Sequence, residues 1–321
     1  MSAAPYLPPS LPAHARARAV APLDLSLLAS LPSLPLRSRY LVESYLTGLH
    51  RSPLKGTALE FAEYRNYQPG DDLRRLDWRL YGRSDRLHVK QFEEENQLRV
   101  CLVLDLSASL RYRSQPQLLT KLDFARTLLG GLSLLARRQH DAVGLALVGD
   151  TPSAADSGLV DYLPPRSSLA HHHALFSRLD QPPATRAAPL VEALHRLATL
   201  LPRGTLVVVA SDFYTDLEPL RGAVRLFRSQ HLEFVGLHVL DPMEVDFNDD
   251  SAGLFTDLEN GHVIPLSAPA ARAGYLKRFR AHCDALTGLC REYDGELVLQ
   301  RTDADPLTTL AAYVAHRAHL V

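Results

Sequence analysis

The chain has 321 residues, of which 46% are hydrophobic, and its 35 basic and 36 acidic side chains give a formal net charge of -1. Such a chain can bury a sizeable core in one or two domains, and its charge balance excludes an overall field that would attract nucleic acid or an anionic membrane. The three cysteines fit neither a disulfide framework nor a zinc-binding spacing, and no segment has the apolar length of a signal peptide or membrane span. We therefore expect a cytoplasmic protein with no nucleic-acid partner and no membrane insertion.

The first part of the chain is predicted to be a tail followed by a helical lead-in. Residues 1–23 are rich in Pro and Ala and have little to bury, so we expect a disordered tail. Leucines recur at helical intervals over residues 25–48, interrupted by prolines, which predicts two short helices with Asp24 as the N-cap of the first. We group this lead-in with the Arg-rich region that follows, as a unit spanning residues 24–97.

The Arg-rich region is predicted to be a small β subdomain. Strands are expected at residues 59–67 and 87–92, with a turn at residues 69–72. Arginines and aromatic residues together can bind nucleic acid, but the acidic residues interleaved here would repel phosphates and pair with the arginines instead. We therefore favour a structural subdomain, with Trp78 as a buried anchor.

Residues 98–321 alternate apolar strands with amphipathic helices. Strands are expected at residues 100–104, 142–148, 159–163, 205–210, 234–240 and 296–300, helices at 118–138, 169–179, 189–201, 217–228, 272–291 and 306–319, and a hairpin at 253–265. Continuous apolar strands separated by helices are typical of parallel sheets that are covered on both faces. The sequence therefore predicts an α/β fold with a doubly wound, mainly parallel sheet.

Oxygen-bearing side chains follow two of these strands. Asp105, Ser107 and Ser109 come at alternate positions after the first strand, and Asp212 follows the strand at 205–210. Because ligands of open α/β sheets bind at the carboxyl ends of the strands, these residues would share one site if the two strands are neighbours. Small oxygen donors suit a hard cation such as Mg²⁺. The alternative is that Asp105 caps a turn and the serines satisfy the loop backbone.

This loop resembles the metal-ion-dependent adhesion site of von Willebrand factor A domains. The run FAEYRNYQPGDDLRRLDW at residues 61–78, DPME at 241–244 and DLENG at 257–261 are similar to the bacterial domain-of-unknown-function family fifty-eight (DUF58), whose members resemble those domains. The resemblance implies a von Willebrand factor A-type domain at residues 98–321. It also implies action with a MoxR-type AAA ATPase in assembling or activating other protein complexes, the client being unidentified.

The resemblance also implies a further metal ligand on a middle loop. In such domains a threonine commonly stands just before a helix whose counterpart here begins at Pro189, and Ala188 occupies the matching position. Thr185 lies three residues earlier and is the alternative ligand. The expected metal residues are Asp105, Ser107, Ser109, Asp212 and Thr185, and the site is expected to hold Mg²⁺ weakly or in degenerate form.

We expect a non-catalytic interaction protein. The enzyme that the residues would permit is a Mg²⁺-dependent phosphatase of the haloacid dehalogenase type, with Asp105 as nucleophile and Asp212 and Asp216 holding the metal. Such enzymes need a second aspartate two positions after the nucleophile, where this chain has Ser107. The sequence also contains no Gly-rich phosphate loop with Lys and Ser or Thr, and no Gly-x-Ser-x-Gly motif.

Overall fold

The computed structural model describes residues 23–50, 64–66, 88–90, 97–150, 158–180 and 188–320. Contacts divide the chain into two units, one made of residues 1–51 and 98–321 and the other of residues 52–97. Four expected features lie outside the described residues: the tail up to residue 22, the turn at residues 69–72, Trp78, and the expected metal ligand Thr185.

The Arg-rich unit contains two short strands at the positions where strands were predicted. They are β1 (Tyr64–Asn66) and β2 (His88–Lys90), and they pair antiparallel with Arg65 opposite Val89. Within the described residues each strand is three residues long, shorter than the sequence pattern indicated.

A six-stranded sheet forms the centre of the larger unit. Its strands are β3 (Arg99–Asp105), β4 (Ala142–Val148), β5 (Leu159–Arg166), β6 (Thr205–Ser211), β7 (Glu233–Leu240) and β10 (Glu296–Arg301). They lie in the order β10-β7-β6-β3-β4-β5, and all neighbours are parallel except β5, which pairs antiparallel with β4. Every residue of β4 and β6 is buried, as expected for strands covered on both faces. The predicted α/β fold with a mainly parallel sheet is confirmed.

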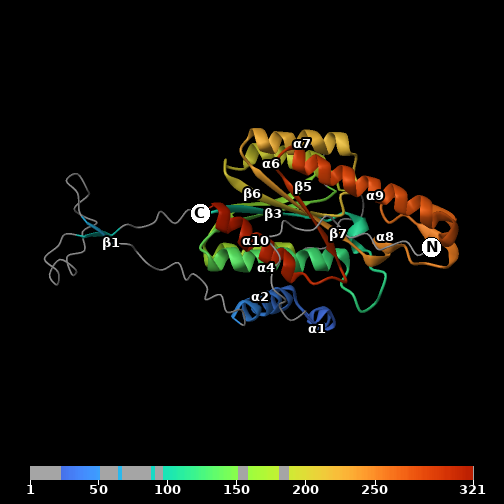
Figure 1. The fold of residues 1–321 in the computed structure, drawn as a ribbon, viewed down its shortest axis with the longest axis horizontal. Helices are drawn as coiled ribbons and strands as arrows, with labels where there is room; N and C mark the ends of the chain where they lie inside the picture. Colours follow the sequence, from blue (N-terminus) through green and yellow to red (C-terminus); the bar gives the residue numbers. More distant parts are fainter. Residues whose placement is uncertain are drawn as a thin grey trace. The chain divides into compact units, whose positions relative to one another are not determined.

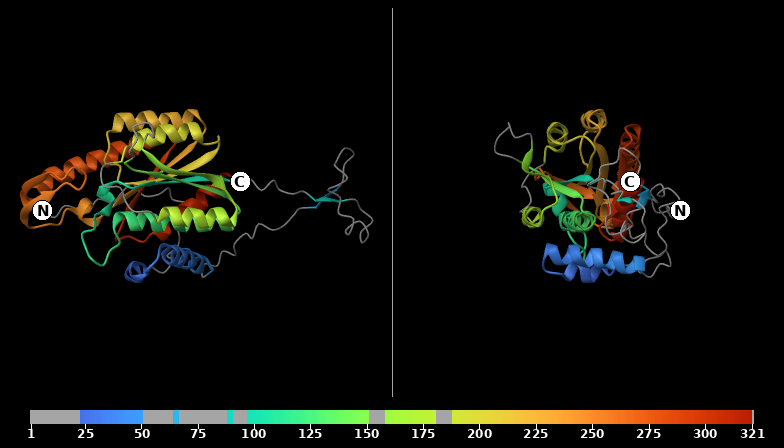
Figure 2. Two further views of the ribbon diagram at one scale, coloured as in Figure 1. Left: turned by 180° about the vertical axis from the view of Figure 1, so that it is seen from behind. Right: turned by 90° about the vertical axis from the view of Figure 1, so that its left-hand side faces the viewer.

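Helices cover both faces of this sheet (Figures 1 and 2). On one face lie α2 (Leu34–His50), α4 (Lys121–Arg138), α5 (Leu169–Leu179) and α10 (Leu307–Leu320), and on the other α6 (Leu190–Leu200), α7 (Leu217–Ser229) and α9 (Ala268–Glu292). Short elements complete the unit: α1 (Leu25–Ser30), the 3-10 helix η3 (Ala108–Arg111), α8 (Pro242–Asp246), and the hairpin of β8 (Ala252–Thr256) and β9 (Val263–Ser267). No helix in the described ranges is both long and apolar enough to cross a membrane.

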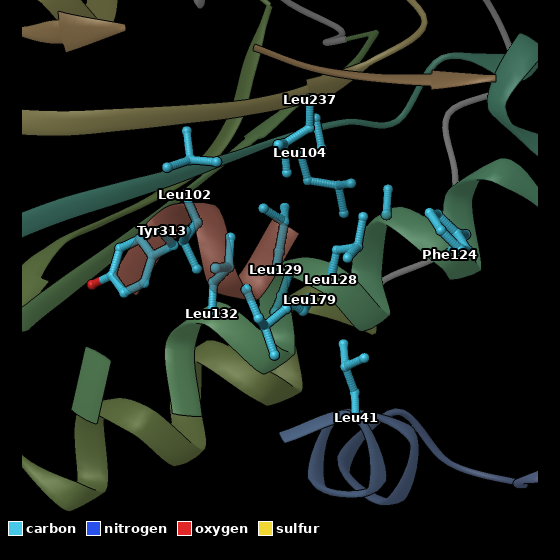
Figure 3. Close-up of a cluster of buried hydrophobic side chains, with 14 of the residues drawn as sticks. Leu41, Leu102, Leu104, Phe124, Leu128, Leu129, Leu132, Leu179, Leu237 and Tyr313 are labelled. Carbon is cyan, nitrogen blue, oxygen red and sulfur yellow. The ribbon is translucent and has the colours of Figure 1, made fainter. Parts of the chain in front are cut away.

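The lead-in helices belong to the core of the α/β unit, whereas the sequence analysis grouped them with the Arg-rich region. Leu41 of α2 lies in the same buried cluster as Leu128 and Leu129 of α4 (Figure 3). The two helices approach closely because α4 has a glycine where they meet: a Cβ added to Gly130 would lie 2.2 Å from Oγ of Ser38. The apolar face of α2 thus finds its partner about 90 residues later in the chain, which local periodicity does not reveal.

The first of these helices begins where the sequence indicated. Asp24 is the N-cap of α1, and its Oδ1 accepts hydrogen bonds from the backbone N–H groups of Ser26 and Leu27 at 3.0 and 3.1 Å. These bonds satisfy N–H groups that have no partner within the helix.

Candidate functional site

Two carboxylates meet at the carboxyl end of the sheet because β3 and β6 are neighbours. In the register of this parallel pair Leu104 lies opposite Ala210, so Asp105 at the end of β3 and Asp212 just after β6 reach the same edge. Their exposed fractions are only 4% and 3%. The expectation that these acids share one edge of the sheet is therefore met.

The Asp105 carboxylate is held by hydrogen bonds on both oxygens. Oδ1 accepts from the backbone N–H of Ser107 at 2.8 Å, and Oδ2 accepts from the hydroxyl of Ser211 at 2.6 Å. Burial raises the pKa of Asp105 to about 7, with the charge of Asp212 adding to the shift and the hydrogen bonds opposing it. Asp105 is thus a fixed carboxylate whose negative charge is poorly compensated by its surroundings.

The two serines lie together in the loop that follows β3. Their Oγ atoms are 3.1 Å apart; Ser107 immediately precedes η3, and Ser109 lies within it. Asp105 does cap this turn through the N–H of Ser107, so the local structural role left open by the sequence is present. The hydroxyls nevertheless contact each other, which keeps two neutral oxygen donors on one side of the loop.

Lys121 is a site residue whose place the sequence analysis missed. Its ammonium at the first position of α4 donates to Oδ2 of Asp212 at 2.9 Å and to Oε1 of Glu244 at 2.7 Å, and its side chain is completely buried. Burial lowers the pKa of Lys121, but the charges of Asp212 and Glu244 outweigh this effect and raise it. The ammonium also lies 5.5 Å from the ring centre of Tyr214.

The motif DPME supplies the other partner of this lysine. It forms a capping box at the start of α8, in which Asp241 accepts from the N–H of Met243 at 2.8 Å and Glu244 accepts from the N–H of Asp241 at 2.8 Å. The second Asp241 oxygen accepts from the N–H of Ser114 at 2.9 Å, which ties the loop after η3 to α8. The capping-box pattern of DPME, with Asp241 before a proline and Glu244 three residues later, is the sequence signal that could have indicated that Glu244 is fixed here.

A further carboxylate faces the site from the turn between β8 and β9. Burial raises the pKa of Glu259, and the charge of Asp212 contributes to the rise. The DLENG motif that contains Glu259 thus lies within electrostatic reach of the carboxyl end of β6.

Ala188 stands just before α6, at the position where the family resemblance places a threonine ligand. Ala188 is partly buried against the apolar cluster under α6 and α7, and its methyl group cannot bind a cation. Thr185 lies outside the described residues.

The donors that the structure does bring together are carboxylate and hydroxyl oxygens, the ligand types that Mg²⁺ prefers. In the parts of the chain that the structure describes, no three His, Cys, Asp or Glu side chains cluster as metal ligands. The site therefore fits a hard divalent cation only through its serines together with Asp105 and Asp212.

Comparison with known proteins gives a family match and several similar chains. The family described as "Protein of unknown function DUF58" matches residues 63–285. An uncharacterized protein of Mycobacterium tuberculosis is 30% identical over 298 residues, covering 92% of this chain and 90% of the relative. Among solved structures, the conserved hypothetical protein BatB of Bacteroides thetaiotaomicron has a TM-score of 0.42 at 16% identity, covering 69% of this chain and 99% of that one. The SpRpn10 VWA domain has a TM-score of 0.37 at 12% identity, with coverages of 68% and 95%.

Proposed function

This chain belongs to the DUF58 family, and from that premise we propose that it is a non-catalytic protein-interaction module. Its docking site is the rim, defined as Asp105, Ser107, Ser109 and Asp212. The observation that carries the proposal is the convergence of these four side chains at the ends of two adjacent parallel strands, the place where open α/β sheets bind their ligands.

In this proposal the rim would hold Mg²⁺, which would supply positive charge for an acidic residue of the partner. Ser107 and Ser109 offer neutral oxygens and Asp105 offers a carboxylate, so a bound divalent ion would keep positive charge for an incoming carboxylate. Lys121 neutralises part of the Asp212 and Glu244 charge and so limits the charge that the ion itself must balance. Because Ala188 provides no oxygen, we expect Mg²⁺ to bind weakly until the partner contributes its own ligand.

The environment of Asp105 argues against the phosphatase alternative. Ser107 stands where the acid and base of such enzymes belongs, and a serine hydroxyl does not ionise near neutral pH.

We propose a MoxR-type AAA ATPase as the partner class, on the strength of the family resemblance in the sequence. The client on which the pair would act is a second, separate protein. In such an arrangement this chain recognises and presents the client while the ATPase supplies the mechanical work.

The test is co-purification of the full-length protein from its native cells in Mg²⁺, compared with Asp105→Ala and Ser109→Ala. Asp216→Ala is the matched control, because Asp216 is exposed and lies just beyond the rim. We expect both rim variants to lose a partner that Asp216→Ala retains, and EDTA to release it. Equal recovery of the same partners by all four proteins would remove the rim from the mechanism. Turnover of a phosphoester that is lost in Asp105→Asn would favour the phosphatase instead.

A further inference from the structure

A cavity of about 460 Å³ is lined by α2, the C-terminal end of α4 and the residues that lead into α5. Val42 and Leu134 give it an apolar base, and Arg39, Arg137 and Arg138 bring three guanidinium groups to it. No acidic side chain is among the described residues that line it. The cavity is therefore a concave surface with a strong excess of positive charge.

The charges of the three arginines are not paired with carboxylates in the part of the chain that the structure describes. Within the described ranges, none of the side chains of Arg39, Arg137 and Arg138 forms an ion pair, whereas Arg126 and Arg178 do. All three guanidinium groups are exposed and stay charged at all physiological pH values, so together they give this concave surface a positive potential that attracts anions.

These arginines are not needed to cap α4. The last carbonyls of the helix already accept hydrogen bonds from the backbone, because the N–H of Gln139 bonds to Leu135 and Ala136 and the N–H of Asp141 bonds to Ala136. The C-terminal end of α4 is thus closed by its own chain. The guanidinium groups of Arg137 and Arg138 are left available for another acceptor.

Further donors lie at the same cavity. His140 has a left-handed backbone with φ of 60°, which ends α4 and places the residue at the cavity wall, and Ser167 adds a hydroxyl. Helix α5 begins at Leu169, another lining residue, so the positive end of its dipole lies at this site. The charge of Arg137 also acts on a residue of α5. Burial lowers the pKa of His172 to about 4, and the nearby positive charge of Arg137 contributes to this lowering.

We propose that this cavity binds a small phosphate-bearing anion with at least two negative charges, held by the guanidinium groups of Arg39, Arg137 and Arg138. Guanidinium forks match phosphate oxygens in bidentate geometry, and here they come from two different helices. The volume of about 460 Å³ lies within the range of small-ligand pockets.

This site is separate from the rim. Lys121 begins α4 at the rim and Arg138 ends the same 18-residue helix at the cavity, so the two sites are about 27 Å apart along the helix. The proposal therefore does not depend on metal binding or on partner docking at the strand ends.

Calorimetric titration of the full-length protein with pyrophosphate at low ionic strength tests the proposal. Arg39→Gln and Arg137→Gln remove one guanidinium each from different helices, and Arg196→Gln removes the same charge from the exposed side of α6. We expect each cavity variant to weaken pyrophosphate binding on the order of tenfold, as the loss of a charged hydrogen-bond donor implies, and Arg196→Gln to leave it unchanged. Thermal unfolding of each variant without ligand checks that it is folded.

Titration with ADP and with adenosine identifies the source of the phosphate. ADP binding with the same dependence on Arg39 and Arg137 would assign a nucleotide diphosphate, and binding of pyrophosphate alone would assign a free phosphate compound. Absence of pyrophosphate binding at millimolar concentration would overturn the proposal. Equal weakening in Arg196→Gln would also overturn it, because the interaction would then be a general effect of net charge.

Discussion

The ammonium of Lys121 lies 2.9 Å from Oδ2 of Asp212, and both side chains are almost fully buried. Glu244 contacts the same ammonium at 2.7 Å, so one cation balances two carboxylates at the carboxyl end of the sheet. This arrangement joins the start of α4 to the end of β6 and to α8. The ion pairs of Lys121 therefore hold Asp212 of the rim in place by linking α4, the end of β6 and α8.

Replacing Lys121 with Met should strongly destabilise the protein. The change keeps the length of the side chain but leaves Asp212 and Glu244 without their cation, and breaking a buried ion pair in this way costs about 3–5 kcal/mol. Urea unfolding measures the difference in the free energy of unfolding. Lys277→Met, on the exposed surface of α9, is the control and should change it by less than about 0.5 kcal/mol. A loss of under about 1 kcal/mol in Lys121→Met would mean that the cluster contributes little to stability.

Asp105→Asn should stabilise the protein at alkaline pH. Because the pKa of Asp105 is about 7 in the folded state and near 3.8 in the unfolded chain, the protonated carboxyl favours folding below pH 3.8, and this contribution is lost as the pH rises through 7. Asparagine does not ionise; its amide oxygen can accept from the N–H of Ser107, and its NH₂ group can donate to the hydroxyl oxygen of Ser211. Denaturation at pH 5 and pH 8 should show the advantage of the variant growing with pH. If Asp105→Asn gained the same free energy of unfolding at both pH values, the raised pKa of Asp105 would be contradicted.

Ala188→Thr should tighten Mg²⁺ binding by supplying the missing hydroxyl. Mg²⁺ gives up its waters reluctantly, so each additional protein oxygen changes affinity measurably. Calorimetry with MgCl₂ on the unmodified protein and the variant makes the comparison, and Thr185→Ala should have no effect if Thr185 is only a loop residue. Tight Mg²⁺ binding by the unmodified protein that disappears in Thr185→Ala would instead show that the ligand has moved three residues along the chain.

Gly144→Ala should destabilise the edge of the sheet, because β5 passes very close to this glycine. An added Cβ would lie 2.7 Å from the carbonyl oxygen of Leu163 and 2.9 Å from the nitrogen of Pro165, both backbone atoms that cannot move independently. Overpacking of this kind costs about 1–3 kcal/mol. Thermal unfolding provides the measurement.

Gly274→Ala is the matched control for this prediction. It lies within α9 with no heavy atom within 4 Å of the added Cβ, and it should gain up to about 1 kcal/mol from helix propensity. If Gly144→Ala were as stable as Gly274→Ala, the close contact between Gly144 and the backbone of β5 would be contradicted.

Part of the candidate site could be predicted because its signal is local. Asp105, Ser107 and Ser109 lie within five residues of one another at the end of an apolar strand, and the structure places them in one loop. Lys121 could not be assigned in this way, because its partners Asp212 and Glu244 are 91 and 123 residues away in sequence. A lone lysine at the start of an amphipathic helix looks like a solvated residue until its neighbours in space are known.

The sequence by itself determined the succession of strands and helices and their approximate limits. Helical and strand periodicities are set by neighbouring residues, so the limits of β4, α5 and β8–β9 were predicted to within about two residues. Only the tertiary structure decided which strands are neighbours, that α2 packs on α4, and that Lys121 is buried between two carboxylates. These relationships depend on contacts between residues far apart in the chain, whose free energy comes from burial and charge pairing that no local pattern encodes.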